Sequence, residues 1–133
     1  MSKLILLILL FSLTGCFENS GNLSNKCVKN EKNNNLSSTI TYQINFKKDI
    51  INNLTITYDY SADQITIDAI KNSYKSQNNF IGVDFIEEES DNKYKITYSN
   101  IDLSKDYSYF IVREKRSELV SLLEKEGFEC KND

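Results

Sequence analysis

The stretch that decides the fold is LSSTITYQINFK, residues 36–47, in which apolar and polar residues alternate. Its apolar residues fall on even positions: Leu36, Ile40, Tyr42, Ile44 and Phe46. This alternation predicts a strand with one buried face and one face in water. The alternation resumes over residues 54–60, beyond the short polar link at residues 47–49. Two such runs joined by a short link predict an antiparallel hairpin.

A helix is predicted directly after the hairpin. Ser61 and Gln64 have the spacing of a capping box, and Tyr60 can pack against Ile65 as a hydrophobic staple. Helical spacing continues to about Asn78, with an expected inward face of Ile65, Ala69, Ile70 and Tyr74.

The remaining elements follow from similar patterns. Strands are expected at residues 26–32, at residues 80–87 and at residues 93–99, and the acidic residues 87–92 are expected to link the last two. The apolar residues of 101–112 fit no single period. Residues 113–126 predict an amphipathic helix that ends at Gly127, with an inward face of Leu119, Leu122 and Leu123.

The order of strands, helix, strands and helix predicts an α+β fold. We expect a two-layer sandwich, in which helices pack on one face of a mostly antiparallel sheet. Residues 26–133 have the size of one domain.

The N-terminus carries a different signal. After the positive lead of Lys3, residues 4–13 are uncharged but only about half as long as a bilayer span. They have the length of a signal-peptide core, and the LTGC at residues 13–16 resembles the lipobox of bacterial lipoproteins. The resemblance implies that Cys16 carries diacylglycerol and that residues 1–15 are a cleaved signal peptide. An ordinary signal peptide with a chance cysteine, or an uncleaved short anchor, are the alternatives.

This leader predicts where the protein lies. Two acyl chains anchor stably where one does not, so we expect a lipid-anchored protein on the extracytoplasmic face of the cell membrane. Residues 16–25 form the expected lipidated cysteine and tether. Cys27 and Cys130 then remain as an even set with one possible pairing in an oxidising compartment. Two free thiols are the alternative to this disulfide.

Charge and composition exclude several classes of function. The formal net charge is −3, and removal of Lys3 with the leader makes it −4. Without a basic stripe, the chain is a poor candidate for binding nucleic acid. The chain has no histidine, which removes His-based triads, His zinc ligands and the commonest general base. We therefore expect no catalytic residues, no metal and no cofactor.

Some residues could still bind a ligand or partner. Four residues have a spacing that suggests a calcium-binding loop: Asp59, Ser61, Asp63 and Asp68. The segment lacks the glycine that calcium-binding loops need, and its acidic residues suit the start of a helix better. Tyrosines in phase with the aliphatic residues are expected in the core, or around an apolar cavity that takes a small ligand: Tyr42, Tyr58, Tyr94 and Tyr98. The opposite side of the sheet is expected to be solvated or to contact a protein: Thr39, Thr41, Thr55, Thr57, Lys93, Lys95 and Thr97.

The whole mature chain resembles the YehR-like lipoproteins. The resemblance rests on the lipobox, on the strand pair ITYQINF and LTITYDY, on NNFIGVDFIEEE, KYKITYS and the ending LLEKEGFEC. It implies a single YehR-like α+β domain at residues 26–133 and supports pairing Cys27 with Cys130. It implies no activity, and residues 106–113 depart from the family pattern.

These expectations combine into one functional hypothesis. The chain is a monomeric, membrane-anchored, extracytoplasmic lipoprotein whose domain binds a protein or small-molecule partner and is not an enzyme. A small-molecule or lipid carrier with a Tyr- and Ile-lined interior is the main alternative. A hydrolase built on carboxylates and a purely structural or immunity-type surface protein are further classes.

Overall fold

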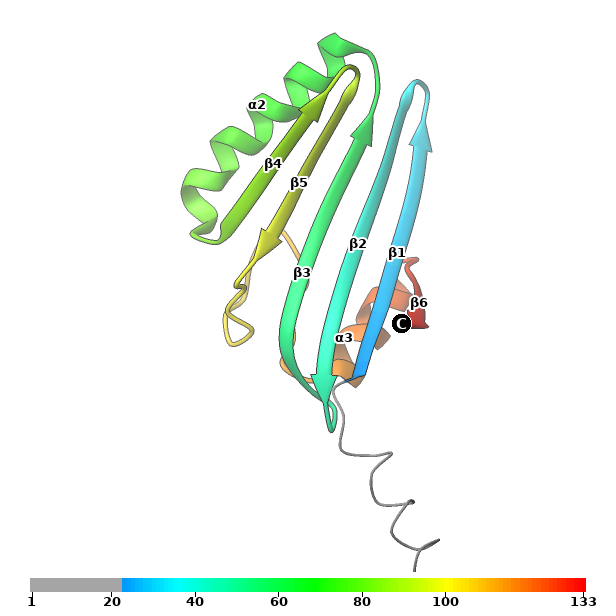
Figure 1. Ribbon diagram of the computed structural model, residues 1–133, viewed down its shortest axis with the longest axis vertical. Helices are drawn as coiled ribbons and strands as arrows, with labels where there is room; N and C mark the ends of the chain where they lie inside the picture. The colour runs from blue at the N-terminus through cyan, green and yellow to red at the C-terminus, as the bar shows by residue number, and fades with distance from the viewer. Residues whose placement is uncertain (1–22) are drawn as a thin grey trace, which may run out of the picture.

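A computed structural model describes residues 23–133, apart from the side chains of residues 79–81. These residues form a six-stranded antiparallel sheet and two helices, with the strand order β4-β5-β3-β2-β1-β6 (Figure 1). The elements are β1 Leu23–Asn33, β2 Leu36–Lys47, β3 Ile50–Ser61, α2 Gln64–Ile81, β4 Asp84–Ser90, β5 Lys93–Ser99, α3 Arg116–Lys125 and β6 Glu129–Asn132. The predicted α+β fold class is confirmed, and the sheet is the larger part of the domain.

The predicted central hairpin is confirmed as β2 and β3. Tyr42 lies opposite Ile56, and Ile44 lies opposite Leu54, so inward residues face the same side from both strands. The turn between the strands places Lys48 and Asp49 at φ +49° and +67°. Two consecutive left-handed residues match the right-handed twist of the flanking strands.

Inward residues of the strands and helices meet in one hydrophobic core. β2, β3 and β5 contribute the buried side chains of Tyr42, Ile44, Ile56, Tyr94, Ile96 and Tyr98. Ile67 of α2 and both Leu119 and Leu123 of α3 are fully buried in the same cluster. The predicted core role of the tyrosines is confirmed for Tyr42, Tyr94 and Tyr98, and Tyr58 is partly buried.

The predicted start of α2 is wrong by two residues. β3 continues through Ser61, which pairs with Ser37 and Lys93, so Ser61 cannot cap the helix. Asp63 is the N-cap instead, and its carboxylate accepts a hydrogen bond from the backbone N–H of Thr66 at 2.8 Å. The predicted inward face is confirmed in part: Ile70 and Tyr74 pack against the core, but Ile65 is 85% exposed and Ala69 is exposed, whereas Ile67 is fully buried.

The region between α2 and β5 also differs from the prediction. Residues 80 and 81 end the helix rather than begin a strand, and Gly82 follows at φ +67°. The acidic residues 87–89 lie inside β4, which leaves residues 91 and 92 as the turn to β5. Val83 is buried, whereas Phe85 is 41% exposed.

The C-terminal elements follow the prediction more closely. Leu119 and Leu123 are buried as expected and Leu122 is partly buried, although α3 begins three residues later than predicted. Gly127 follows the helix with φ +95°, in the left-handed region expected of a glycine that ends a helix.

The disulfide and the start of the domain complete the fold. β6 pairs with β1 and places Cys130 opposite Cys27, and a disulfide joins the two. β1 begins at Leu23, so residues 23–25 of the expected tether belong to the sheet. Cys16, the rest of the tether and the expected signal peptide 1–15 lie outside the described residues. Neither α2 nor α3, the two helices of residues 23–133, combines the length and the apolar character needed to cross a bilayer.

Candidate functional site

The side of the sheet turned away from the core carries a polar surface that we call the threonine face. The strand register places its members side by side: Thr39, Thr41, Thr55, Thr57, Lys93, Lys95 and Thr97. Thr57 and Thr97 sit opposite each other, and their hydroxyls lie 3.3 Å apart. These threonines are partly exposed, so the predicted wet side of the sheet is confirmed.

One end of the threonine face is hollowed into a groove of about 510 Å³. Its lining combines hydroxyls with charges of both signs: Ser37, Thr39, Asp59, Tyr60, Ser61, Glu88, Glu89, Ser90, Lys93 and Lys95. Lys95 pairs with Glu88 across the strands, with 3.6 Å between Nζ and Oε2. The groove can exchange hydrogen bonds and ion pairs with a ligand.

A group of tyrosines lies on the inner side of the sheet, beneath α2. Tyr74 of α2 contacts the rings of Tyr58, Tyr60 and Tyr94, with centroids 5.8–5.9 Å apart. The Tyr60 and Tyr74 hydroxyls share a hydrogen bond. Burial is the main cause that raises the pKa of each of these phenols above its ordinary value, so all of them stay protonated near neutral pH.

A small cavity opens beside these tyrosines, between α2 and the irregular segment that follows β5. It measures about 260 Å³ and is lined by Tyr58, Tyr74, Gln77, Tyr98, Ser108, Tyr109 and Phe110. The Tyr98 hydroxyl donates to Asn78 Oδ1 at 2.6 Å, while the buried Asn78 Nδ2 has no hydrogen-bond partner. The volume lies just below the range of about 300–1,000 Å³ typical of small-molecule sites.

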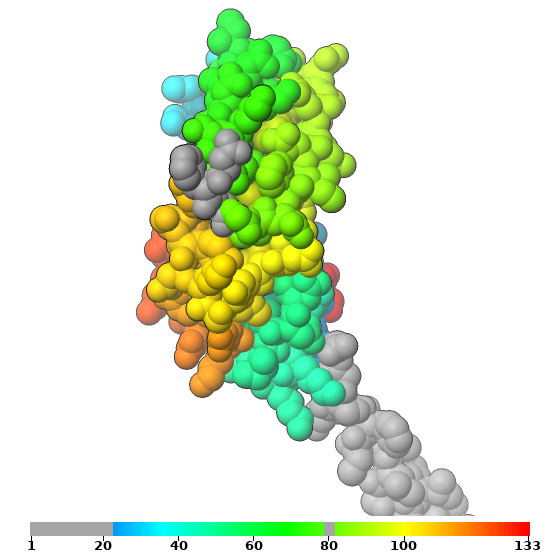
Figure 2. Space-filling model, turned by 90° about the vertical axis from the view of Figure 1, so that its left-hand side faces the viewer, coloured from blue at the N-terminus to red at the C-terminus, as the bar shows by residue number. Residues whose placement is uncertain are grey.

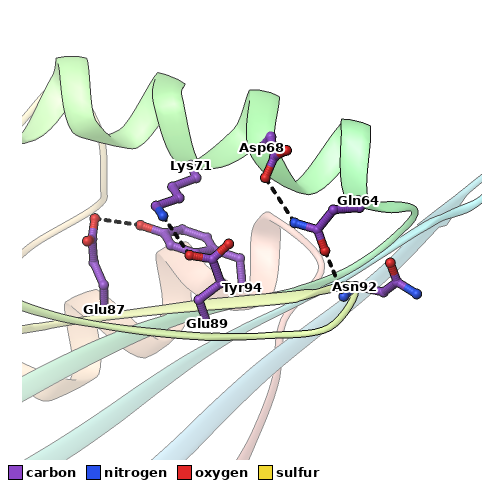
Figure 3. Close-up of polar contacts among 7 residues, drawn as sticks. All are labelled: Gln64, Asp68, Lys71, Glu87, Glu89, Asn92 and Tyr94. Atoms are coloured by element: carbon purple, nitrogen blue, oxygen red, sulfur yellow. Dashed lines mark hydrogen bonds and ion pairs between the residues drawn. The ribbon is translucent and has the colours of Figure 1, made fainter.

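The acidic residues of β4 hold α2 against the sheet edge (Figure 3). Lys71 of α2 pairs with Glu89 at 2.6 Å, and the Tyr94 hydroxyl donates to Glu87 at 2.8 Å. At the start of the helix, Gln64 accepts a hydrogen bond from the backbone N–H of Asn92. The bond from Lys71 to Glu89 raises the pKa of that ammonium. The acids predicted as a solvated link are therefore partly structural.

The residues with calcium-like spacing are not brought together. Asp59 and Ser61 lie in β3, Asp63 caps α2, and Asp68 accepts a hydrogen bond from Gln64. No group of three or more His, Cys, Asp or Glu side chains placed to hold a metal ion occurs in residues 23–133.

Sequence patterns did not identify every residue of these sites. Asn78 is a polar residue near the end of a predicted helix, and nothing in the pattern marks it as a partner for Tyr98. Tyr74 could be found from its helical spacing with Ile70. The sequence predicts Asp49 only as part of the link between two strands, but Asp49 also contacts the start of α3.

Comparison with known proteins adds no assignment to this geometry. No protein-family model, no curated protein and no solved structure matches this chain.

Proposed function

We propose that this chain is a lipoprotein, anchored through Cys16 to the extracytoplasmic face of the cell membrane, whose single domain binds another protein and catalyses no reaction. The lipobox-like LTGC at residues 13–16 and the similarity to YehR-like lipoproteins support the anchor. The proposed partner site is the threonine face.

The observation that carries the proposal is the side on which the helices pack. Ile67 of α2 and Leu119 and Leu123 of α3 enter one core with the inward residues of the sheet. We propose that this makes a two-layer sandwich, with both helices on one face. The threonine face is then a broad strand surface left without a covering layer, and its hydroxyls and paired charges suit the polar surface of a protein.

The anchor is tested by replacing the acylated cysteine. Cys16→Ala should leave an unprocessed precursor or release the protein from the membrane, measured by fractionation and by mass spectrometry of the N-terminal peptide. Cys27→Ala and Cys130→Ala together form the control, because they remove cysteines without touching the lipobox. Processing and membrane attachment that are unchanged in Cys16→Ala would contradict the anchor.

The partner site is tested by crosslinking on intact cells. A photoreactive residue at Thr57, in the middle of the threonine face, should give one discrete adduct. The same residue at Ser73, an exposed position of α2, is the control and should not give that adduct. A Thr41→Arg substitution on the same face should abolish the Thr57 adduct. Identical adducts from both positions, or none from Thr57, would contradict the proposal.

The cavity beside the tyrosines supports a second candidate function, a small-molecule carrier. Its phenols could hold a small, flat or apolar molecule. Native mass spectrometry of protein purified from its host should then show an added mass, and Ser108→Trp, which fills the cavity, should remove it. Protein without any added mass would leave the threonine face as the only candidate site.

A further inference from the structure

The end of the domain where β1 begins combines exposed apolar side chains with basic ones. We call it the N-terminal pole and define it by Leu23, Lys47, Lys48, Ile50 and Lys115. The register joins these residues: Leu23 lies opposite Phe46, Lys47 opposite Ile50, and Ile50 forms a bridge with Lys115. The β2–β3 turn and the start of β1 lie together at the bottom of Figure 1, and the same end is at the bottom of Figure 2.

The N-terminal pole exposes apolar side chains that the core does not use. Leu23 is 59% exposed and Ile50 is 53% exposed. Leu23 lies opposite the buried Phe46, and Ile50 precedes the buried Ile51, yet both side chains remain at the surface. Exposed aliphatic residues next to flexible lysines are typical of surfaces that lie in a membrane interface.

Positive charge gathers at the same end of an acidic protein. Around the pole, five cations stand against four acidic side chains: Lys47, Lys48, Arg113, Lys115 and Arg116 against Asp49, Glu114, Glu118 and Asp133, whose backbone N–H binds the carbonyl of Ser24. Asp49 is already engaged by Arg116 and Ser117. Lys47, Lys48 and Lys115 form no ion pair within residues 23–133 and are exposed. The acidic β4–β5 hairpin lies at the opposite end of the sheet (Figure 1).

We propose that the N-terminal pole docks on the bilayer surface, with Leu23 and Ile50 among the lipid headgroups and Lys47, Lys48 and Lys115 against anionic phospholipids. This inference rests on the proposed anchor at Cys16. Residues 17–22 join that cysteine to Leu23, and a chain of this length reaches at most about 25 Å when fully extended. The chain therefore enters the domain at its basic, apolar end, and a short link keeps that end close to the membrane.

Docking also orients the proposed partner site. With the N-terminal pole on the bilayer, the strands run away from the membrane, and the groove at the far end of the threonine face lies at the most distant part of the domain. A partner in the surrounding medium could then reach the groove.

The test measures how close single positions come to the lipid. An Ile50→Cys variant of the lipidated chain is labelled with an environment-sensitive fluorophore, and Asn35→Cys, in the turn between β1 and β2 at the far end, is the matched control. The added cysteine is the only free thiol when Cys16 is acylated and Cys27 is bonded to Cys130. In vesicles containing phosphatidylglycerol and spin-labelled lipid, the probe at position 50 should be quenched at least several-fold more than the probe at position 35.

Charge reversal separates this inference from the anchor. Lys47→Glu, Lys48→Glu and Lys115→Glu together should leave the lipidated protein on the vesicles but abolish the excess quenching at position 50. Equal quenching of the vesicle-bound Ile50→Cys and Asn35→Cys variants that keep all three lysines would overturn the docking and leave the anchor intact.

An unlipidated chain tests the pole even if the anchor is wrong. A Cys16→Ser chain produced without residues 1–15 should sediment with phosphatidylglycerol vesicles in a salt-dependent manner, and the triple Glu variant of the same chain should bind at least tenfold more weakly. A Cys16→Ser chain that does not sediment with anionic vesicles at low salt would overturn the docking. Failure of the wild-type chain to become acylated in its host would overturn the anchor alone.

Discussion

The carboxylate of Asp49 accepts hydrogen bonds from the backbone N–H of Ser117 at 2.9 Å and from its hydroxyl at 2.6 Å. A residue in the β2–β3 turn thus caps α3 from 68 positions away. The helix lacks a cap of its own, because Lys115 at the N-cap makes no side-chain hydrogen bond. The contact fixes the last helix to the central hairpin.

Asp49→Ala should therefore lower the midpoint of thermal unfolding, since the N–H groups at the start of α3 lose their acceptor. Circular dichroism at 222 nm would measure it. Lys48→Ala is the matched control, because Lys48 also has a positive φ in the same turn but forms no hydrogen bond or ion pair with α3. Equal losses in the two variants would show that the turn, and not the cap, carries the effect.

The same capping bonds predict acid sensitivity. Hydrogen bonds from Ser117 lower the pKa of Asp49 below its ordinary value of 3.8, and bonds from Thr66 do the same for Asp63. A carboxyl with a lower pKa when folded stabilises the protein fully above its unfolded pKa and loses this contribution as the pH falls through the folded value. The midpoint of thermal unfolding of wild type should thus decrease once the pH is lowered beneath about 4. The same change of pH should lower the midpoint of Asp49→Asn by a smaller amount.

The sequence could predict elements whose burial pattern is local. The alternation around Tyr42 placed β2, and the leucine spacing placed α3, because each pattern reflects one face against one core. The start of α2 could not be predicted, since Ser61 is held in β3 by partners on two other strands. The sites were less predictable still, because Asn78, Asp49 and Glu87 acquire their roles only through contacts between distant elements.

Two isoleucines of α2 with opposite burial give a direct comparison. Ile67→Ala should lower the free energy of unfolding by about 2–5 kcal/mol, because it removes a fully buried side chain. Ile65→Ala changes the same residue type two positions away on an 85% exposed side chain, and its effect should stay within about 0.5 kcal/mol. Urea unfolding at equilibrium measures both. Similar losses of unfolding free energy in the two variants would show that Ile65 packs inward, as the sequence predicts.

The disulfide should supply a large part of the stability. Cys27 and Cys130 are 103 positions apart, and the chain-entropy model gives about 4.7 kcal/mol for a loop of this length. Cys27→Ser with Cys130→Ser should lower the free energy of unfolding by an amount of this order. A reducing agent should bring wild type to the same midpoint and leave the double variant unchanged. An unfolding midpoint of wild type that does not change with the reducing agent would show that the disulfide contributes little to stability.

The hydroxyl of Tyr42 fixes the segment for which the sequence offers no period. It donates to the carbonyl of Ile111 at 3.1 Å and accepts from the N–H of the same residue at 3.2 Å. Tyr42→Phe leaves both backbone groups of Ile111 without this partner in a partly buried place, which should lower the free energy of unfolding by about 1–3 kcal/mol.

Hydrogen exchange in Tyr42→Phe should accelerate over residues 107–112, where Phe110 and Val112 are buried, and stay unchanged in β5. Tyr94→Phe removes a hydroxyl bonded to the exposed Glu87 and is the control, for which exchange over residues 107–112 should match wild type. Unchanged exchange at Ile111 in Tyr42→Phe would mean that packing alone holds the segment.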